Sequence, residues 1–390
     1  MPEFVQTSAT QELPTPFHFP GVKAWVFMFE ISMGPVKRYC DTYLNLGDPR
    51  RRPFVYRPMP LYPYATMMVL EYPIMVSADR NPAVDPTFAA RGFMSQKEVL
   101  IDFPVLRHGT RLDNFLSDVS LEFAVPFIVV DNATSAISGR EIIGFQKIVG
   151  QIDIETIVGK SALGGALHET GFTTSVNLPG YDSAGSENEL EHLVRFMDIK
   201  TGPPVPGVGA SPNSGSIMTL FDTGLAAKTF EGAAGLYDLV NKLACGTLPN
   251  LQQMVALKQF RDPSSPKSAI YQAITTASPR YYNVRDIKYY NENDVYICLR
   301  DKGSLSDITK ALFDRDSIHS KNVQWLDQGD GSNKIVIKPA LACSFTSEID
   351  YDEQSILYTY VSPDDPRGGR PTGNMISPWL KPWMGFWARR

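Results

Sequence analysis

The chain has 390 residues, of which 43% are hydrophobic and 20% charged, with a formal net charge of −5. This hydrophobic content supplies enough material for a core and excludes wholesale disorder. The mild acidity argues against a general nucleic-acid binder, because such proteins present a surplus of positive charge.

The sequence shows no membrane helix, no secretory signal and no cysteine motif. No run approaches the roughly 20 apolar residues of a membrane helix, and the first residues lack the basic and apolar regions of a secretory signal. The cysteines at 40, 245, 298 and 343 are widely spaced and form no CxxC. The sequence therefore predicts neither a disulfide framework nor a zinc knuckle. It predicts that the protein works in a reducing, cytosolic compartment.

Strand patterns dominate the chain. Segments rich in β-branched and aromatic residues predict strands at 24–31, 65–76, 121–130, 334–338 and 356–361. Residues 280–300 predict a hairpin that turns at 291–294. Helices are predicted at 188–196, 224–244 and, behind the capping serines 304 and 306, at 307–313. The 30 prolines disfavour long helices. The predicted fold class is α+β, dominated by antiparallel strands.

Several common motifs fail in detail. Val158-Gly159-Lys160-Ser161 ends like a phosphate loop, but Ile154 stands where its first glycine belongs. The five histidines lack metal-ligand spacing, and no GxSxG elbow occurs. We therefore predict neither a metal nor a cofactor.

Residues 138–150, Ser-Gly-Arg-Glu-Ile-Ile-Gly-Phe-Gln-Lys-Ile-Val-Gly, place Lys147 in a largely apolar run. Most such lysines extend a solvated ammonium group from an apolar stem. Burial among Ile, Phe and Val would instead favour the neutral amine. A neutral amine can attack a ketone and form an imine, which accepts the electron pair released when a neighbouring carbon bond breaks. Lys147 is thus a candidate nucleophile.

This segment resembles the active-site segment of the acetoacetate decarboxylase family, in which the lysine corresponding to Lys147 forms the Schiff base. The strand around Glu71 and the turn Asp131-Asn132 are also similar to that family. The resemblance implies a cone-shaped β-barrel or double sheet, a homo-oligomer and a small keto substrate. It spans residues 18–362 and implies one domain over 1–362 with an insertion at about 165–250.

Other site residues follow from the same resemblance. It implies catalytic roles for Glu71 and for either Gln96 or Glu98. Lys23, Arg140 and Glu141 are candidates for substrate binding, although Arg140 and Glu141 also suit a structural ion pair beside the lysine loop. The family's second lysine is replaced here by Ile148, so its effect on the first lysine would have to come from desolvation or from another cation.

The C-terminal tail, 363–390, carries Trp379, Trp383 and Trp387. Pro382 opposes a regular helix there. The tail is predicted to dock on the core or on a neighbouring subunit; contact with a membrane surface is the alternative.

The leading hypothesis is a Schiff-base carbon–carbon lyase of the decarboxylase type. An aldolase or dehydratase working through the same imine is the first alternative. A non-catalytic barrel that binds an apolar ligand is the second.

Overall fold

The computed structural model describes residues 13, 15–60, 62–77, 94–110, 119–160, 167–179, 193–205, 253–301, 306–315, 322–329 and 333–361. Within these ranges the helices are short: α1 (Met33–Tyr39), η1 (Cys40–Leu44), α3 (Ala133–Ser138), η2 (Gly139–Ile143), η4 (Glu292–Asp294) and α6 (Ser306–Leu312). The strands are β1 (Phe17–Glu30), β2 (Phe54–Pro58), β3 (Tyr64–Ser77), β4 (Met94–Gly109), β5 (Val119–Val130), β6 (Lys147–Val149), β7 (Gln151–Lys160), β8 (Leu167–Pro179), β9 (Leu193–Thr201), β10 (Met254–Arg261), β11 (Ala269–Tyr289), β12 (Tyr296–Asp301), β13 (Val323–Asp327), β14 (Asn333–Ile337) and β15 (Leu341–Val361).

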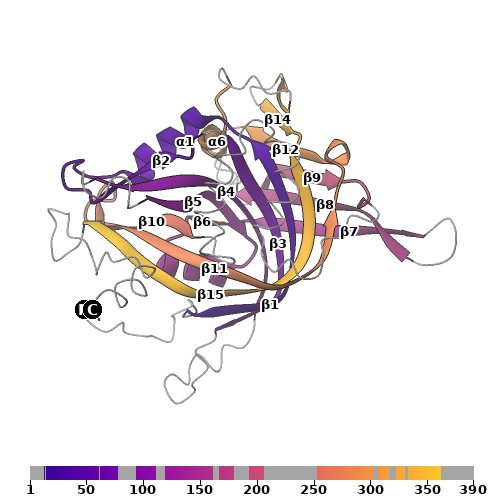
Figure 1. Ribbon diagram of the computed structural model, residues 1–390, viewed down its shortest axis with the longest axis horizontal. Helices are drawn as coiled ribbons and strands as arrows, with labels where there is room; N and C mark the ends of the chain where they lie inside the picture. The colour runs from indigo at the N-terminus through magenta and orange to yellow at the C-terminus, as the bar shows by residue number, and fades with distance from the viewer. Residues whose placement is uncertain are drawn as a thin grey trace, which may run out of the picture.

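The strands form two sheets (Figure 1). The larger has the order β2-β4-β3-β1-β15-β11-β10-β5-β6, and β4 also pairs with β5. This extra ladder links β1, β3, β4, β5, β10, β11 and β15 into a closed ring. The smaller sheet has the order β13-β14-β12-β9-β8-β7. The predicted α+β class, a double sheet of mostly antiparallel strands with peripheral helices, is confirmed.

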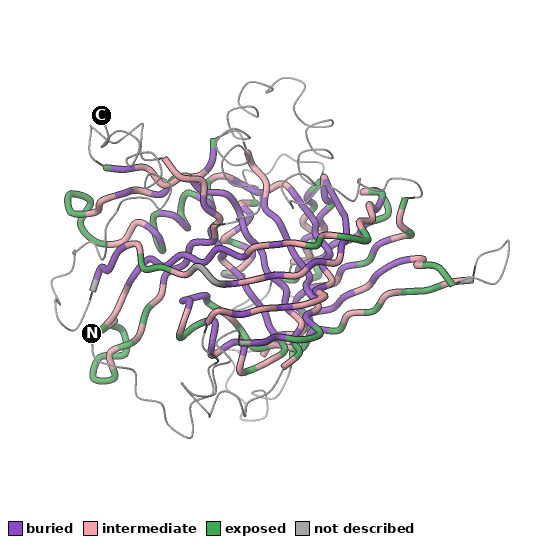
Figure 2. Tube along the Cα trace, turned by 60° about the horizontal axis from the view of Figure 1, so that its bottom comes forward, coloured by how far each residue is buried: buried purple, intermediate pink, exposed green. Residues whose placement is uncertain are grey.

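Strands β1, β3, β4 and β5 of the large sheet contain long runs of buried residues, and Figure 2 shows buried segments through the middle of the molecule. Residues 24–29 of β1 are therefore apolar without a break, although their side chains alternate between faces. Trp25 and Phe27 belong to one cluster, which we call the first face, whereas Ala24 and Val26 belong to another, the second face.

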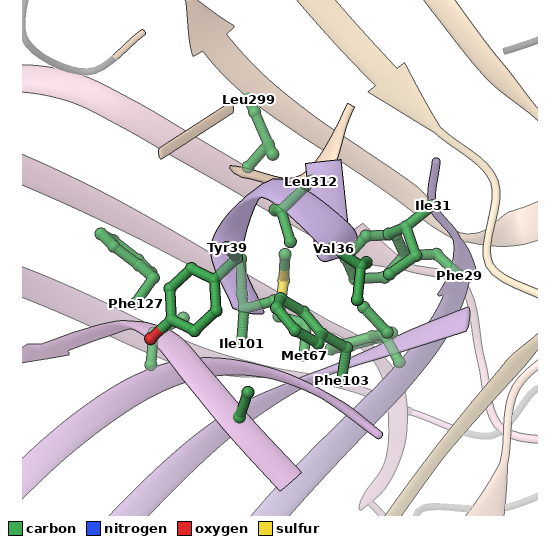
Figure 3. Close-up of a cluster of buried hydrophobic side chains, with 14 of the residues drawn as sticks. Phe29, Ile31, Val36, Tyr39, Met67, Ile101, Phe103, Phe127, Leu299 and Leu312 are labelled. Atoms are coloured by element: carbon green, nitrogen blue, oxygen red, sulfur yellow. The ribbon is translucent and has the colours of Figure 1, made fainter. Parts of the chain in front are cut away.

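The first face packs against the small sheet and the helices. The rings of Trp25 and Phe172 of β8 stack with centroids 4.2 Å apart. Elsewhere on the first face, α1 presents Val36 and Tyr39 to side chains of the large sheet (Figure 3). Tyr39 meets Phe103 edge to face, with centroids 5.4 Å apart. Burial of these large rings stabilises the contact between the layers.

Several predicted elements differ from the observed ones. β11 and β12 do follow each other through the predicted turn, but β11 pairs with β10 and β15 while β12 pairs with β9 and β14. The predicted hairpin at 280–300 is therefore wrong, because its two strands enter different sheets. The predicted helix at 188–196 is also wrong where it is described, since 193–196 begin β9.

The predicted insertion includes β8 and β9, which are inner strands of the small sheet. The predicted helix at 224–244 and the Trp-rich tail lie outside the described residues, so the domain boundaries remain predictions. The helices that the structure describes are all too short or too polar to cross a membrane.

Candidate active site

Lys147 lies on β6, which pairs in parallel with the end of β5 so that Lys147 is opposite Ile128. Ile128 belongs to the second face. The Nζ of Lys147 donates a hydrogen bond to Glu98 Oε2 at 2.7 Å and another to Ser135 Oγ at 3.2 Å. The exposed fractions of the Lys147 and Glu98 side chains are 10% and 4%. The amine is thus enclosed, and its direct partners are a carboxylate and a hydroxyl group.

Glu98 reaches the amine because of its register on β4. It lies opposite Val130 of β5, whose side chain belongs to the second face. β6 borders β5 on its other side, so the long side chain of Lys147 crosses β5 to meet Glu98. Adjacent strands are about 4.8 Å apart, so β6 and β4 are separated by about 9.6 Å, which the two long side chains of Lys147 and Glu98 cover together.

Gln96 lies two residues before Glu98 and therefore on the same face. The sequence left Gln96 and Glu98 as alternatives, and the structure places both side chains on the second face, buried. Gln96 is opposite Tyr72 of β3. The hydroxyl of Tyr72 lies 3.5 Å from Glu98 Oε1, at the limit of hydrogen bonding.

Glu71 and Lys23 lie elsewhere. They are opposite each other on β3 and β1, and Glu71 is also opposite Lys97. Their positions alternate with those of Leu70 and Ala24, so their side chains emerge on the first face. Lys23 donates to Thr156 Oγ1 at 2.9 Å, and its Nζ lies 4.4 Å from the centre of the Trp25 ring. The structure therefore does not bring Glu71 or Lys23 to Lys147.

Arg140 and Glu141, the other two predicted binding residues, are exposed on η2. Their side chains turn outward, while the backbone of η2 is anchored on the sheet. Thr275 Oγ1 donates to Ile143 O at 2.6 Å, and Lys258 Nζ donates to Ile142 O at 3.2 Å. Burial lowers the pKa of Lys258, and Glu141 opposes that shift.

The turn Asp131-Asn132 fixes the lysine segment to β4. Asp131 Oδ1 accepts from the backbone N–H of Lys97 at 2.7 Å, and Asn132 Nδ2 donates to Ser95 O at 3.1 Å. Asn132 also caps α3, since its Oδ1 accepts from Ser135 N at 3.2 Å. These contacts hold the backbone at 95 and 97, and the alternate positions 96 and 98 emerge on the second face, where Glu98 binds the amine.

The glycines of the lysine segment are required by close packing. A Cβ on Gly139 would lie 2.6 Å from Lys147 Cε and 2.7 Å from its Cδ. Gly144 ends η2 with a φ of +96°, and a Cβ there would lie 2.5 Å from the Cβ of Lys258. The spacing of Gly139 and Lys147 in the sequence thus reflects the close packing of the lysine side chain against η2.

Sequence reasoning missed Ser135 and Tyr72. Ser135 could have been found from the capping pattern, because it stands three residues after the helix-capping Asn132. Tyr72 carried no such signal, since it is one of many large residues in β3. In the described part of the chain, no group of three or more His, Cys, Asp or Glu side chains could hold a metal.

Buried tyrosines surround the carboxylate. Burial first, and then the charge of Glu98, raises the pKa of Tyr72 well above its usual value. Burial, followed by Asp102 and Glu98, raises the pKa of Tyr281 in the same way. These phenols stay protonated, so the Tyr72 hydroxyl is a donor toward Glu98.

These shifts predict loss of stability in alkali. A tyrosine whose pKa is raised on folding holds its proton in the native state while the unfolded chain loses it above about pH 10. Its stabilising contribution is complete below that pH and falls by about 1.4 kcal/mol per pH unit above it. Urea unfolding at pH 8, 10 and 11 measures the slope. Tyr281→Phe should make the slope shallower above pH 10 only; an identical slope would contradict the assignment.

Gly139→Ala tests the packing of the lysine. The backbone of Gly139 has φ −63° and ψ −39°, which alanine adopts readily, so the expected effect comes from the contact with Lys147 alone. We expect the rate of carbonyl adduct formation at Lys147 to fall by about 10²-fold, as for a misplacement of about 1 Å. Gly159→Ala is the control: its Cβ would lie 2.6 Å from Thr170 Cγ2, far from the site on the β7–β8 hairpin. Equal losses in both variants would contradict the prediction.

No protein-family model matches the sequence, and no curated protein matches it significantly. Solved structures do. An acetoacetate decarboxylase is similar at 9% identity and a TM-score of 0.49, over 91% of this chain and 94% of that one. A decarboxylase of the same name from Legionella pneumophila has 10% identity and a TM-score of 0.46, over 92% of each chain. An acetoacetate decarboxylase-like enzyme from Sphingomonas wittichii has 10% identity and a TM-score of 0.47, over 90% of this chain and 96% of that one.

They bear the name of the family that the Gly-Arg-Glu segment was expected to resemble. Because every one of these TM-scores is below 0.5 and the identities are about a tenth, the function has to be argued from the residues of the site itself.

Proposed function

We propose that the protein is a Schiff-base enzyme, a carbon–carbon lyase in which Lys147 condenses with a carbonyl substrate. The observation that carries the proposal is the 2.7 Å contact between Lys147 Nζ and Glu98 Oε2, both enclosed on the second face. A lysine ammonium must lose a proton before it can attack. Glu98 is a proton acceptor within one hydrogen bond of it.

The same carboxyl group serves the next step. The neutral amine attacks the carbonyl carbon, and the carbinolamine then expels its hydroxyl group as water. Glu98, now protonated, is placed to donate the proton that this departure needs. The iminium product withdraws electrons from the neighbouring carbon, so no separate cofactor has to supply that sink.

Desolvation, or a cation from elsewhere in the chain, was the expected activation of Lys147. The contacts favour a different account, in which a paired carboxylate takes the proton and the hydroxyl of Ser135 orients the amine. The substrate is proposed to be a small keto compound.

Reductive trapping tests the proposal. The full chain is incubated with a panel of ketones, aldehydes and keto acids in the presence of borohydride, and the modified lysine is mapped by mass spectrometry. Lys23 and Lys258 are internal controls, because burial lowers the pKa of both. We expect a reduced adduct on Lys147 and none on these two. Adducts on the controls instead, or on no lysine with any compound, would leave a non-catalytic barrel as the remaining hypothesis.

A further inference from the structure

Gln96 is a buried amide two residues before Glu98, the carboxylate that binds the proposed nucleophile. Its side chain emerges on the same face as Glu98 and is opposite Tyr72, whose hydroxyl approaches Glu98. The exposed fraction of Gln96 is 4%. Its Oε1 is buried and has no hydrogen-bond partner among the described residues.

A buried amide oxygen without a hydrogen-bond partner is unfavourable, and native proteins contain few of them. Such a group on the same face as Glu98, the partner of Lys147, is suited to a polar group of a ligand that enters the site. The amide has both a donor and an acceptor end, and a half-turn about its last bond exchanges them. Gln96 can therefore hydrogen-bond either a hydroxyl group or a carbonyl oxygen of a substrate.

The charges of the site restrict that substrate. Within the described residues, Lys147 forms an ion pair with Glu98, and neither residue forms an ion pair with any other. Asp102 is also fully buried, and it acts with Glu98 in raising the pKa of Tyr281 and Tyr351, after burial itself. A substrate carboxylate would therefore add negative charge to a region that already holds the buried Glu98. Among the described residues, Lys147 is the cation that forms an ion pair with Glu98, so a substrate carboxylate would compete with Glu98 for it.

Aromatic rings enclose the same region. The ring of Phe19 lies 4.7 Å from that of Tyr72 and 5.8 Å from that of Tyr351, centre to centre. All three belong to the second-face cluster. Rings of this kind favour an apolar or aromatic substituent on the substrate.

We infer that the site takes an uncharged β-hydroxy ketone or the ketone and aldehyde that compose it, rather than a keto acid, and that Gln96 binds the oxygen of this substrate. The inference rests on the proposed function, because it requires the imine at Lys147. It selects aldol chemistry over decarboxylation.

The steps balance without an oxidant or a reductant. Lys147 and the ketone carbonyl form an iminium ion and release water. A base, Glu98, takes the proton of the β-hydroxyl group as the bond between the α- and β-carbons breaks. The aldehyde leaves, and the bonding electrons form an enamine with the iminium nitrogen. The enamine takes the proton back from Glu98 at its α-carbon, and water hydrolyses the resulting iminium ion to the ketone and free Lys147.

A matched substrate pair tests the inference. The probes are 4-hydroxy-4-phenylbutan-2-one and 4-hydroxy-2-oxo-4-phenylbutanoate, which differ only in a methyl group replaced by a carboxylate. Release of benzaldehyde by the full chain gives kcat/KM for each, and borohydride trapping counts adducts on Lys147. We expect kcat/KM to be at least about 10-fold higher for the neutral compound. Equal values, or a preference for the acid, overturn the inference while adducts on Lys147 still support the Schiff base.

Two variants test the role of Gln96. Gln96→Leu keeps the size and removes the hydrogen bonds, so kcat/KM for the neutral compound should fall about 10-fold. Gln96→Arg adds the missing cation and should shift the preference toward the acid. An unchanged kcat/KM in Gln96→Leu overturns the assignment of Gln96. If neither compound forms an adduct with the wild-type chain, nor does any other carbonyl compound, the proposed function and this inference both fail.

Discussion

Lys147→Met is expected to abolish adduct formation and to lower the free energy of unfolding by about 3–5 kcal/mol. Methionine has nearly the shape of lysine but no amine, so the substrate has no nucleophile to meet. Loss of a nucleophile reduces turnover on the order of 10⁴-fold or more. The loss of stability has a separate cause, because Glu98 keeps its burial and loses its cation.

A second variant separates the two effects. In Lys147→Met combined with Glu98→Leu, both ends of the buried pair are apolar, and such replacements are often neutral in stability. Urea unfolding should therefore show recovery toward the wild-type value, whereas trapping should remain absent. If the double variant is as unstable as the single one, the pair is not the source of the loss. If Lys147→Met still forms the adduct, another lysine is the nucleophile.

The position of Lys147 could be predicted from sequence because the signal is local. Gly139 has to lack a side chain for the lysine to pass, and this requirement fixes a glycine at a set distance from the lysine. The turn Asp131-Asn132 leaves a similar local pattern, since both side chains bind the backbone of β4.

The carboxylate could not be assigned in the same way. β3 begins Tyr-Ala-Thr-Met-Met-Val-Leu-Glu-Tyr, so apolar residues near Glu71 point to both faces of the strand. When both faces of a strand are buried, alternation disappears, and the sequence does not tell which face a given residue takes. The sequence therefore did not show that Glu71, which was predicted to be catalytic, would point away from Lys147; the register places Glu71 opposite Lys97 and Glu98 opposite Leu70.

Gln96 and Glu98 were alternatives for a related reason. They are two residues apart on β4, so their side chains point to the same face of the sheet. The structure places the side chains of both residues on the second face, so the two alternatives do not exclude each other. Long-range pairing also explains the false hairpin, because the strands at 280–300 look alike in sequence although they enter different sheets.

Glu98→Gln is expected to slow adduct formation at Lys147 by about 10²–10⁴-fold, the range for loss of a general acid–base group. The amide has the size of the carboxylate and can still accept a hydrogen bond from Lys147 Nζ across the 2.7 Å contact. It cannot hold the proton that the ammonium must give up. The proton then has to pass to solvent, so trapping in the variant should become faster as the pH rises, more steeply than in the wild type.

Glu122→Gln is the matched control for this variant. Glu122 is also buried, binds Arg107 Nε at 2.6 Å and accepts from the Tyr56 hydroxyl at 2.7 Å. Its replacement should lower the free energy of unfolding, as loss of a buried charge partner does, but leave trapping at Lys147 unchanged in the folded protein. A Glu98→Gln variant with wild-type trapping kinetics would show that Glu98 only holds the lysine in place. Slow trapping in both variants would trace the defect to general damage to the fold, because Glu122 has no contact with the amine.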